Sequence, residues 1–247
     1  MPVRALFIDI DNTLCQKIPE AKPATDFLGQ SLLRAMVDFA IDTRGLQRQQ
    51  AEDIVRSTHD TLRWWHWTDF IIALDLDAAA FWEFAYARER RFLGPVEPEL
   101  HRSMEALRRS GWNLFITSNN PSSGILHKLR LAGLAEIWGS PYFNQYLGPC
   151  ELHCMKKEPE FWRRALAHTG LSASAVTVVG DNPLDDIAAP RAAGISSTIL
   201  YAPLPPDQPL PEYAPIAHSW PDIVTMMANI RQGSQQNASA LPATEVA

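Results

Sequence analysis

Two aspartates and a threonine follow the first apolar segment of the chain at alternate positions. Residues 3–8 form a run that is apolar except for Arg4, and Asp9, Asp11 and Thr13 come directly after it. An aspartate carboxylate can attack phosphorus to form an acyl-phosphate, which divides one difficult displacement into two easier ones. A second aspartate two residues further on can protonate the leaving oxygen and later activate a water molecule. The pattern is therefore suited to phosphoryl transfer at one strand end.

Three further polar clusters lie where the pattern predicts the end of a strand or the start of a helix. They are the Thr-Ser-Asn-Asn run at residues 117–120, the pair Lys156 and Lys157 before Pro159, and residues 180–186 with Asp181, Asp185 and Asp186. Carboxylates crowded at one sheet edge raise each other's pKa values unless a divalent cation neutralises them. Magnesium prefers a few carboxylates together with water and phosphate oxygens. A hydroxyl, an amide and a lysine can bind phosphoryl oxygens, so the clusters predict a magnesium site for a phosphorylated ligand.

The elements that must position these clusters alternate between strand and helix in the second part of the chain. Apolar runs predict strands at residues 3–8, 112–117, 175–179 and 197–201, helical patterns lie at 99–110, 124–131, 159–168, 184–193 and 221–231, and residues 138–146 form an irregular aromatic stretch. Such alternation is typical of a parallel, doubly wound sheet, whose ligands bind at the carboxyl ends of the strands. We therefore expect an α/β fold that brings the four clusters to one edge.

Residues 24–93 differ from the rest of the chain because they show helical periodicity, few glycines and no strong strand signal. Proline-bearing segments at residues 19–23 and 95–98 bound this region. We predict an all-helical insertion. Its many aromatic residues are interpreted mainly as packing among its helices, with one or two facing a pocket. At the other end of the chain, residues 232–247 are small and polar, and we predict that they are disordered.

In this order the clusters resemble the four motifs of the haloacid dehalogenase superfamily, whose members are mostly phosphatases. Asp9, Asp11 and Thr13 match its Asp-x-Asp-x-Thr motif at every defined position. The resemblance implies that Asp9 is the nucleophile and that Asp11 is the general acid and base, with its backbone carbonyl offered to magnesium. Ser118, followed by Asn119, resembles the second motif.

The third motif of the family often reads Lys-Pro-x-Pro before a helix. Lys156 takes the lysine position, but Lys157 replaces the first proline, so the choice between the two lysines stays open. Asp181 and Asp186 fit the fourth motif, Gly-Asp-x-x-x-x-Asp, as metal ligand and supporting acid. The resemblance thus implies catalytic Asp9, Asp11, Ser118 and Lys156; substrate-binding Thr13, Ser118, Asn119 and Lys156; and metal-binding Asp9, Asp11, Asp181 and Asp186, with Mg²⁺ as cofactor.

The same resemblance divides the chain. It implies a Rossmann-like α/β core of residues 1–16 and 95–231, a helical cap of residues 17–94 inserted between the first and second motifs, and the tail of residues 232–247. The partner would be a small phosphorylated metabolite such as a sugar phosphate, phosphoglycolate or a nucleotide.

Composition limits the other classes of function. Hydrophobic residues make up 46% of the 247 residues, and the net charge of -6 argues against a general nucleic-acid or membrane-surface binder. No apolar run is long enough to span a bilayer, and the N-terminus lacks the features of a signal peptide. Cys150, His153 and Cys154 offer soft metal ligands but lack a regular fourth, which disfavours zinc. With three cysteines in no framework spacing, we expect a reduced, cytoplasmic setting.

Three alternatives to a phosphatase stay open. A 2-haloacid dehalogenase has the same nucleophile, but this class of enzyme lacks the aspartate that Asp11 supplies here. A phosphomutase passes the phosphoryl group of the aspartyl-phosphate to a second substrate instead of water. A non-catalytic binding protein on this fold would be favoured by the loss of Asp9 or Asp181, and both are present.

Overall fold

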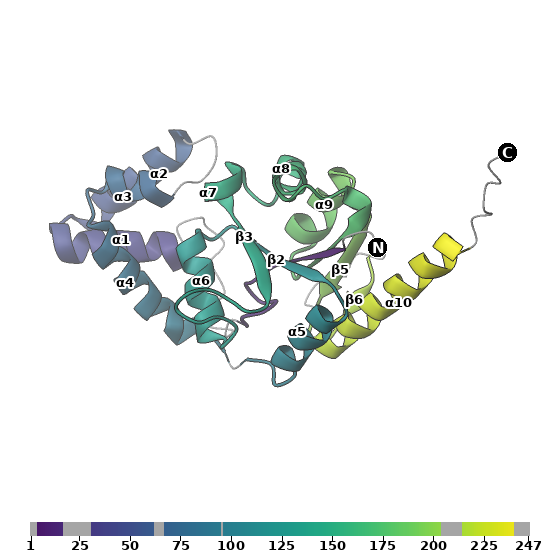
Figure 1. Ribbon diagram of the computed structural model, residues 1–247. Coiled ribbons are helices and arrows are strands. Elements are labelled where there is room, and N and C mark those ends of the chain that lie inside the picture. The colour runs from purple at the N-terminus through teal and green to yellow at the C-terminus, as the bar shows by residue number, and fades with distance from the viewer. Residues whose placement is uncertain (1–3, 17–30, 62–66, 95, 204–213, 240–247) are drawn as a thin grey trace.

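A parallel sheet of six strands forms the centre of the protein (Figure 1). The computed structural model describes residues 4–16, 31–61, 67–94, 96–203 and 214–239. The strands lie in the order β3-β2-β1-β4-β5-β6, and every neighbouring pair is parallel. Their bounds are β1 Ala5–Ile8, β2 Asn113–Thr117, β3 Phe143–Leu147, β4 Val176–Gly180, β5 Ser197–Tyr201 and β6 Ile216–Ala217.

The register of the central strands places their carboxyl ends level with one another. Ile8 of β1 pairs with Ile116 of β2 on one side and with Val179 of β4 on the other. The ladder continues one step further, because the Asp9 backbone N–H donates to the Val179 carbonyl at 2.9 Å. The residues that follow β1, β2 and β4 therefore share one edge of the sheet, as the sequence predicts.

Helices cover both faces of the sheet, because alternate residues of each strand point to opposite sides. Leu6 and Ile8 of β1 belong to a cluster with α5 (Leu100–Arg109), α6 (Ser122–Leu131) and α10 (Trp220–Ser239). Phe7 belongs to a second cluster with α8 (Pro159–Thr169) and α9 (Ala189–Ala192). Figure 1 shows α5 and α10 on one side and α8 and α9 on the other. The predicted doubly wound α/β fold is confirmed.

In the described part of the chain, four α-helices lie between β1 and α5, the helix that precedes β2. They are α1 (Ser31–Arg44), α2 (Arg48–Thr61), α3 (Trp67–Ala73) and α4 (Ala78–Glu89), followed by the short 3₁₀ helix η3 (Arg90–Phe92). They share a hydrophobic cluster of their own that holds Phe39, Trp67, Phe70 and Phe81. For these aromatic side chains, the interpretation that they pack among the helices of the insertion is confirmed. Trp64, Trp65 and His66 of the same aromatic run lie outside the described residues.

The sequence analysis did not predict two of the strands. Strand β3 lies in the stretch that we predicted to be irregular, and β6 has only two residues. Both are edge strands of the sheet. An edge strand has one neighbour, so it needs no continuous apolar run, and β3 carries the exposed residues Asn144 and Gln145. The short helices α7 (Pro149–Leu152) and η4 (Ala173–Ala175) were also not predicted.

The predicted helix at residues 184–193 is present in a different form. It begins as the π-helix η5 (Pro183–Ala188) and continues as α9. Pro190 has no N–H and cannot donate the α-helical hydrogen bond to the Asp186 carbonyl, which favours a local change of helix type.

The last helix, α10, extends beyond Arg231, where we predicted its end, to Ser239. The first residues of the predicted disordered tail are therefore helical. Adding residues to a helix that already packs on the core requires no new nucleus, so polar residues can continue it. The remainder of that tail, residues 240–247, lies outside the described residues.

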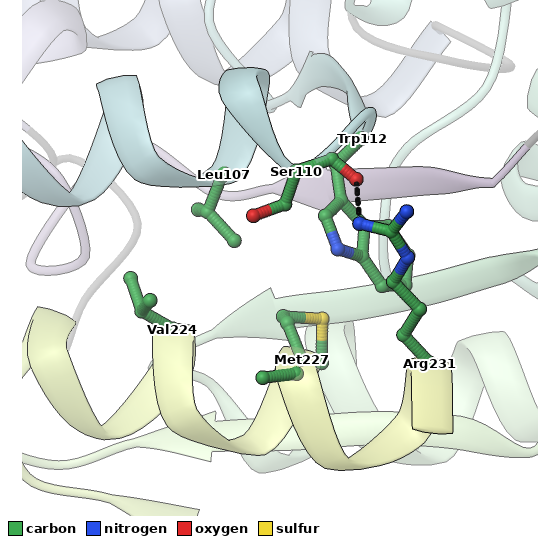
Figure 2. A pocket seen from close by; sticks show the side chains of 7 residues that line it. Leu107, Ser110, Trp112, Val224, Met227 and Arg231 are labelled. Atoms are coloured by element: carbon green, nitrogen blue, oxygen red, sulfur yellow. Dashed lines mark hydrogen bonds between the residues drawn. The ribbon is translucent and has the colours of Figure 1, made fainter. Parts of the chain in front are cut away.

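A cavity of about 300 Å³ lies between α5 and α10 (Figure 2). Ser110 and Trp112, which line it, precede β2, so the cavity is at the amino edge of the sheet, opposite the acidic clusters. Arg231 closes one side by donating to the Ser110 carbonyl at 2.7 Å. Within the described residues, no helix is long and apolar enough to cross a membrane.

Candidate active site

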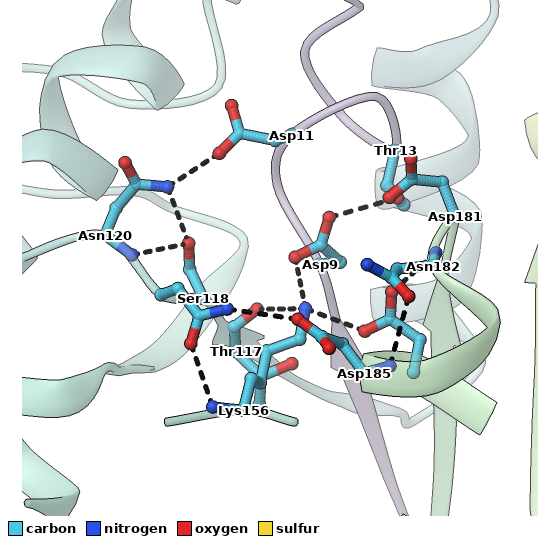
Figure 3. Close-up of polar contacts among 12 residues, drawn as sticks. Asp9, Asp11, Thr13, Thr117, Ser118, Asn120, Lys156, Asp181, Asn182 and Asp185 are labelled. Carbon is cyan, nitrogen blue, oxygen red and sulfur yellow. Dashed lines mark hydrogen bonds and ion pairs between the residues drawn. The ribbon is translucent and has the colours of Figure 1, made fainter. Parts of the chain in front are cut away.

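Asp9 lies at the centre of the polar edge, in the first position after β1 (Figure 3). Its side chain is buried, with 6% of the residue exposed. One carboxylate oxygen accepts a hydrogen bond from Lys156 Nζ, and the other accepts one from Thr13 Oγ1 at 3.4 Å. Thr13 is itself held by Trp220, whose Nε1 donates to the Thr13 carbonyl at 3.1 Å. The carboxylate of Asp9 is thus fixed from two sides.

Lys156 supplies the positive charge of this edge. Its Nζ contacts Asp9 Oδ1 and lies 2.7 Å from Asp186 Oδ1. The backbone of Lys156 is fixed as well, because its N–H donates to Asn119 Oδ1 at 2.8 Å and its carbonyl accepts from Trp162 Nε1 at 2.9 Å. Lys157 is exposed. Of the two lysines that the sequence left open, Lys156 is the one whose side chain lies beside Asp9.

Three carboxylates meet beside Lys156. Asp9, Asp181 and Asp186 each offer one oxygen, and these oxygens lie within 4.8 Å of one another. Burial, together with the charges of Asp186 and Asp11, raises the pKa of Asp9 to about 7 against the opposing effect of Lys156. Burial and the charges of Asp9 and Asp186 likewise raise the pKa of Asp181 well above its ordinary value. Both shifts favour the protonated form of the carboxyl groups, and a further cation beside them would oppose these shifts.

This donor set fits a divalent metal ion. Three ionised carboxylates and one ammonium leave an excess of two negative charges, which a divalent cation would balance. Magnesium takes oxygen ligands and keeps several waters, so it needs only a few carboxylates. Within the described residues, this is the one group of acidic, histidine or cysteine side chains placed to hold a metal ion. The predicted metal residues Asp9, Asp181 and Asp186 are thus brought together.

Asp11 is turned away from these three carboxylates. Its carboxylate accepts from Lys128 Nζ at 2.7 and 3.0 Å and from Asn120 Nδ2 at 2.7 Å, and Figure 3 shows it directed toward Asn120. Lys128 is also 2.9 Å from Glu89 Oε1. Burial favours the uncharged amine of Lys128, but Asp11 and Glu89 outweigh it and raise the pKa of Lys128 above its ordinary value.

The residues of the second motif lie beside Asp11. Ser118 is buried, and its Oγ accepts from the Asn120 backbone N–H at 3.1 Å and from Asn120 Nδ2 at 2.8 Å. These bonds use acceptor sites, so the hydroxyl proton of Ser118 can be donated to a ligand. Asn119 joins two parts of the edge, since its Oδ1 accepts from Lys156 and its Nδ2 donates to Asp185 Oδ2 at 3.1 Å.

Sequence reasoning missed Lys128 and Glu89, and it placed Asn120 in the polar run of residues 117–120 without giving it a role. The signal for Lys128 was present, because it falls on the apolar stripe of α6 with Ile125 and Leu129 and is only 1% exposed. A charged residue on the buried stripe of a helix must find a partner, so this position could have been marked. Nothing in the sequence pairs it with Asp11 or Glu89.

Asn12 also has a role beyond shaping the turn. Its φ of 57° lies in the left-handed region that asparagine tolerates. This conformation turns the chain after β1, and Asn12 Nδ2 donates to Asp181 Oδ2 at 3.2 Å. The first and fourth motifs are therefore linked directly.

Comparison with known proteins identifies the family. Residues 3–194 match the haloacid dehalogenase-like hydrolase family. The chain is 29% identical to a phosphoglycolate phosphatase of Cupriavidus necator over 195 residues, which cover 79% of each chain. It therefore belongs to the haloacid dehalogenase-like hydrolases, and it is a hydrolase.

Solved structures agree with this fold. A HAD phosphatase from Thermococcus onnurineus superposes with a TM-score of 0.62 and 20% identity, over 91% of this chain and 98% of that one. A 2-haloacid dehalogenase from Pseudomonas syringae gives a TM-score of 0.60 and 21% identity, over 92% and 99%. Both kinds of enzyme share the fold, so the fold alone does not choose between their reactions.

The close packing of this edge can be tested by a substitution at Gly180, the last residue of β4. A Cβ at Gly180 would lie 2.1 Å from Asp186 Cγ, whereas a Cβ at Gly124 in α6 would lie 3.5 Å from its nearest neighbours in Pro121. We expect Gly180→Ala to lower the free energy of unfolding by about 1–3 kcal/mol, because Asp186 or the strand must shift. Gly124→Ala is the control and should not lower this free energy, because alanine in a helix is more favourable than glycine by about 0.5–1 kcal/mol. Equal stability of the two variants in denaturant titrations would contradict this packing.

Proposed function

We propose that the protein is a magnesium-dependent phosphohydrolase that acts on a small phosphomonoester through an aspartyl-phosphate on Asp9. The observation that carries the proposal is the arrangement around Asp9. One buried carboxylate at a strand end is fixed by Lys156 and Thr13, stands among the acids Asp181 and Asp186, and has a further aspartate two residues on. Such an arrangement suits a nucleophile that attacks an anionic group, provided that positive charge is concentrated beside it.

In the first step, a carboxylate oxygen of Asp9 forms a bond to phosphorus as the bond from phosphorus to the ester oxygen breaks. Asp11 gives its proton to that leaving oxygen, so an alcohol departs. In the second step, Asp11 takes a proton from water, which attacks the phosphorus of the aspartyl-phosphate. Inorganic phosphate leaves, and Asp9 is regenerated.

The other side chains bind and orient the phosphoryl group. The Lys156 ammonium contacts Asp9, and Ser118 directly follows the neighbouring strand β2, so both side chains can donate to phosphoryl oxygens. Asn119 fixes the Lys156 backbone. A Mg²⁺ ion held by Asp9, Asp181 and Asp186, with the Asp11 carbonyl, would neutralise these carboxylates and offset charge on the phosphoryl oxygens.

The relatives support a small substrate. One of them is named for phosphoglycolate, so this compound belongs in the first panel of phosphomonoesters to be tested. The helices α1 to α4 take the role of the cap of residues 17–94. Because the end of α4 reaches the polar edge through Glu89, this cap would exclude water from the site and contact the leaving group.

A 2-haloacid dehalogenase is the second candidate, since enzymes of that name share the fold. Asp11 favours the phosphatase. Halide leaves without a proton, so a second aspartate would add only repulsion of Asp9, whereas an alkoxide is a poor leaving group that gains from proton donation.

The nucleophile can be tested by Asp9→Asn. The amide keeps the shape of the side chain but is a poor nucleophile, so we expect phosphate release to fall at least about 10³-fold with the fold retained. Chemical trapping should label Asp9 in the wild type only. Asp185→Asn, a change of an acid at the same edge outside the three carboxylates, should cost less than about tenfold. Retention of most activity in Asp9→Asn would exclude the mechanism.

Metal dependence follows from the crowded carboxylates. Removal of divalent ions with a chelator should abolish phosphate release, and added Mg²⁺ should restore it. Calorimetric titration of the metal-free protein with Mg²⁺ should show binding that Asp181→Asn weakens by about tenfold or more, since one anionic ligand is lost. Full activity in excess chelator would contradict the assignment.

A substitution of Asp11 distinguishes phosphomonoester hydrolysis from dehalogenation. We expect Asp11→Asn to keep the fold and to slow hydrolysis of an alkyl phosphate by about 10²–10⁴-fold. The loss should be smaller for 4-nitrophenyl phosphate, whose leaving group needs less protonation. If the wild type instead releases halide from 2-haloacids without metal, and Asp11→Asn leaves that rate intact, the phosphatase assignment is wrong.

A further inference from the structure

The most unusual charged residue outside the three carboxylates is Lys128. It lies on α6 and is 1% exposed, although lysine is rarely buried without partners. Its ammonium group has three protons to donate. Asp11 at 2.7 Å, Glu89 at 2.9 Å and Asn120 at 3.0 Å provide three acceptors. Each proton of the buried ammonium therefore has an acceptor within reach.

These acceptors come from three separate parts of the chain. Asp11 belongs to the turn after β1, Asn120 follows β2, and Glu89 is the last residue of α4 in the helical insertion. The insertion thus contributes a negative charge to the same ammonium group that holds Asp11.

The last turn of α4 is attached to α6 at two further points. Tyr86 Oη donates to Ser123 Oγ at 2.7 Å, and the Tyr86 ring stacks on His127 with centroids 4.2 Å apart. Tyr86 and Glu89 are three residues apart, so both side chains lie on one face of α4. Through these two side chains, that face contacts Ser123, His127 and Lys128 of α6. Figure 1 shows α4 alongside α6. Cys15 Sγ, from the loop after Asp11, donates to the Lys128 carbonyl at 3.5 Å and holds that loop against α6.

We propose that Lys128 is a positioning residue that couples the docking of α4 on α6 to the orientation of the Asp11 carboxylate. If α4 moves away, Lys128 loses Glu89 and its ammonium is no longer held between the two acids. The Asp11 side chain then loses the fixed partner that orients it for proton transfer. The inference rests on the proposed function, because it assumes that Asp11 is the acid and base.

The test compares Lys128→Met and Glu89→Gln with wild type. Methionine fills a similar volume without charge, and glutamine keeps an acceptor but removes the charge on the α4 side. Arg130→Met is the matched control, since it removes an exposed cation from the same helix. For each protein, kcat and KM are measured with an alkyl phosphate that the wild type hydrolyses and with 4-nitrophenyl phosphate. Hydrogen exchange of the α4 amides is followed separately, without substrate or metal.

We expect Lys128→Met to lower kcat for the alkyl phosphate by about 10–100-fold, with a clearly smaller loss for the aryl phosphate and KM changed by less than about threefold. Glu89→Gln should show the same leaving-group pattern with a loss of about 3–10-fold. The double variant should be no slower than Lys128→Met, because Glu89 acts through Lys128. Exchange in α4 should become faster in both variants and stay unchanged in Arg130→Met.

An equal loss of kcat for both substrates, or α4 exchange as slow as in wild type, would overturn the inference. If Lys128→Met does not fold, the test rests on Glu89→Gln. A Glu89→Gln variant that hydrolyses the alkyl phosphate as fast as wild type would then exclude the coupling. The proposed function fails in a different way. If the wild type shows no metal-dependent phosphate release, or if Asp9→Asn stays active, the proposed function is wrong and the inference is wrong with it. If the wild type behaves as proposed and Lys128→Met is unaffected, only the inference is wrong.

Discussion

The contact of the buried Lys156 ammonium with Asp9 and Asp186 is the interaction on which the rest of the site depends. Removing one partner of a buried ion pair typically costs about 3–5 kcal/mol, because a charge is left without compensation. Lys156 must therefore be held in place, and the Asn119 side chain and the Trp162 indole fix its backbone from two sides. Asp186 can approach because Gly180 has no Cβ to exclude it. The level strand ends bring these parts together.

The sequence was sufficient for the central strands and for the four motifs, because both depend on local signals. Strands β1 and β4 are buried throughout, so their residues are apolar apart from Thr177, and polar residues after them must lie at the ligand-binding edge. The edge strand β3 lacked this signal, since its middle residues face solvent or are only partly buried. The change to the π-helix η5 is favoured by Pro190, which lies within an otherwise helical pattern. Hydrophobic periodicity does not reveal such a change of helix type.

The contacts of Lys128 were beyond sequence reasoning for another reason. Glu89, Asp11 and Lys128 meet only because α4 returns to the core and docks on α6, and the hydrogen bond between Lys128 and Asp11 joins residues 117 positions apart. No local pattern encodes such a pairing. The sequence did not distinguish Lys156 from Lys157 for the same reason. The two lysines are adjacent in a loop, and only the contacts with the sheet and with Trp162 make their environments different. Burial separates them, with Lys156 inside and Lys157 exposed.

The negative charge of Asp11 is unfavourable for the ionised form of Asp9, and this bears on the reaction. This charge adds to the effects that raise the pKa of Asp9, so a site that needs only a nucleophile is better without it. The chain instead surrounds Asp11 with a buried lysine and the Asn120 amide, and burying that ammonium requires a second acid, Glu89. Three residues on three elements thus support one carboxylate. An arrangement of this kind is understandable where the carboxylate must exchange a proton at a fixed position, as ester cleavage requires, and it has no use where halide leaves unprotonated. The surroundings of Asp11 therefore favour the phosphatase over the dehalogenase within a fold that both share.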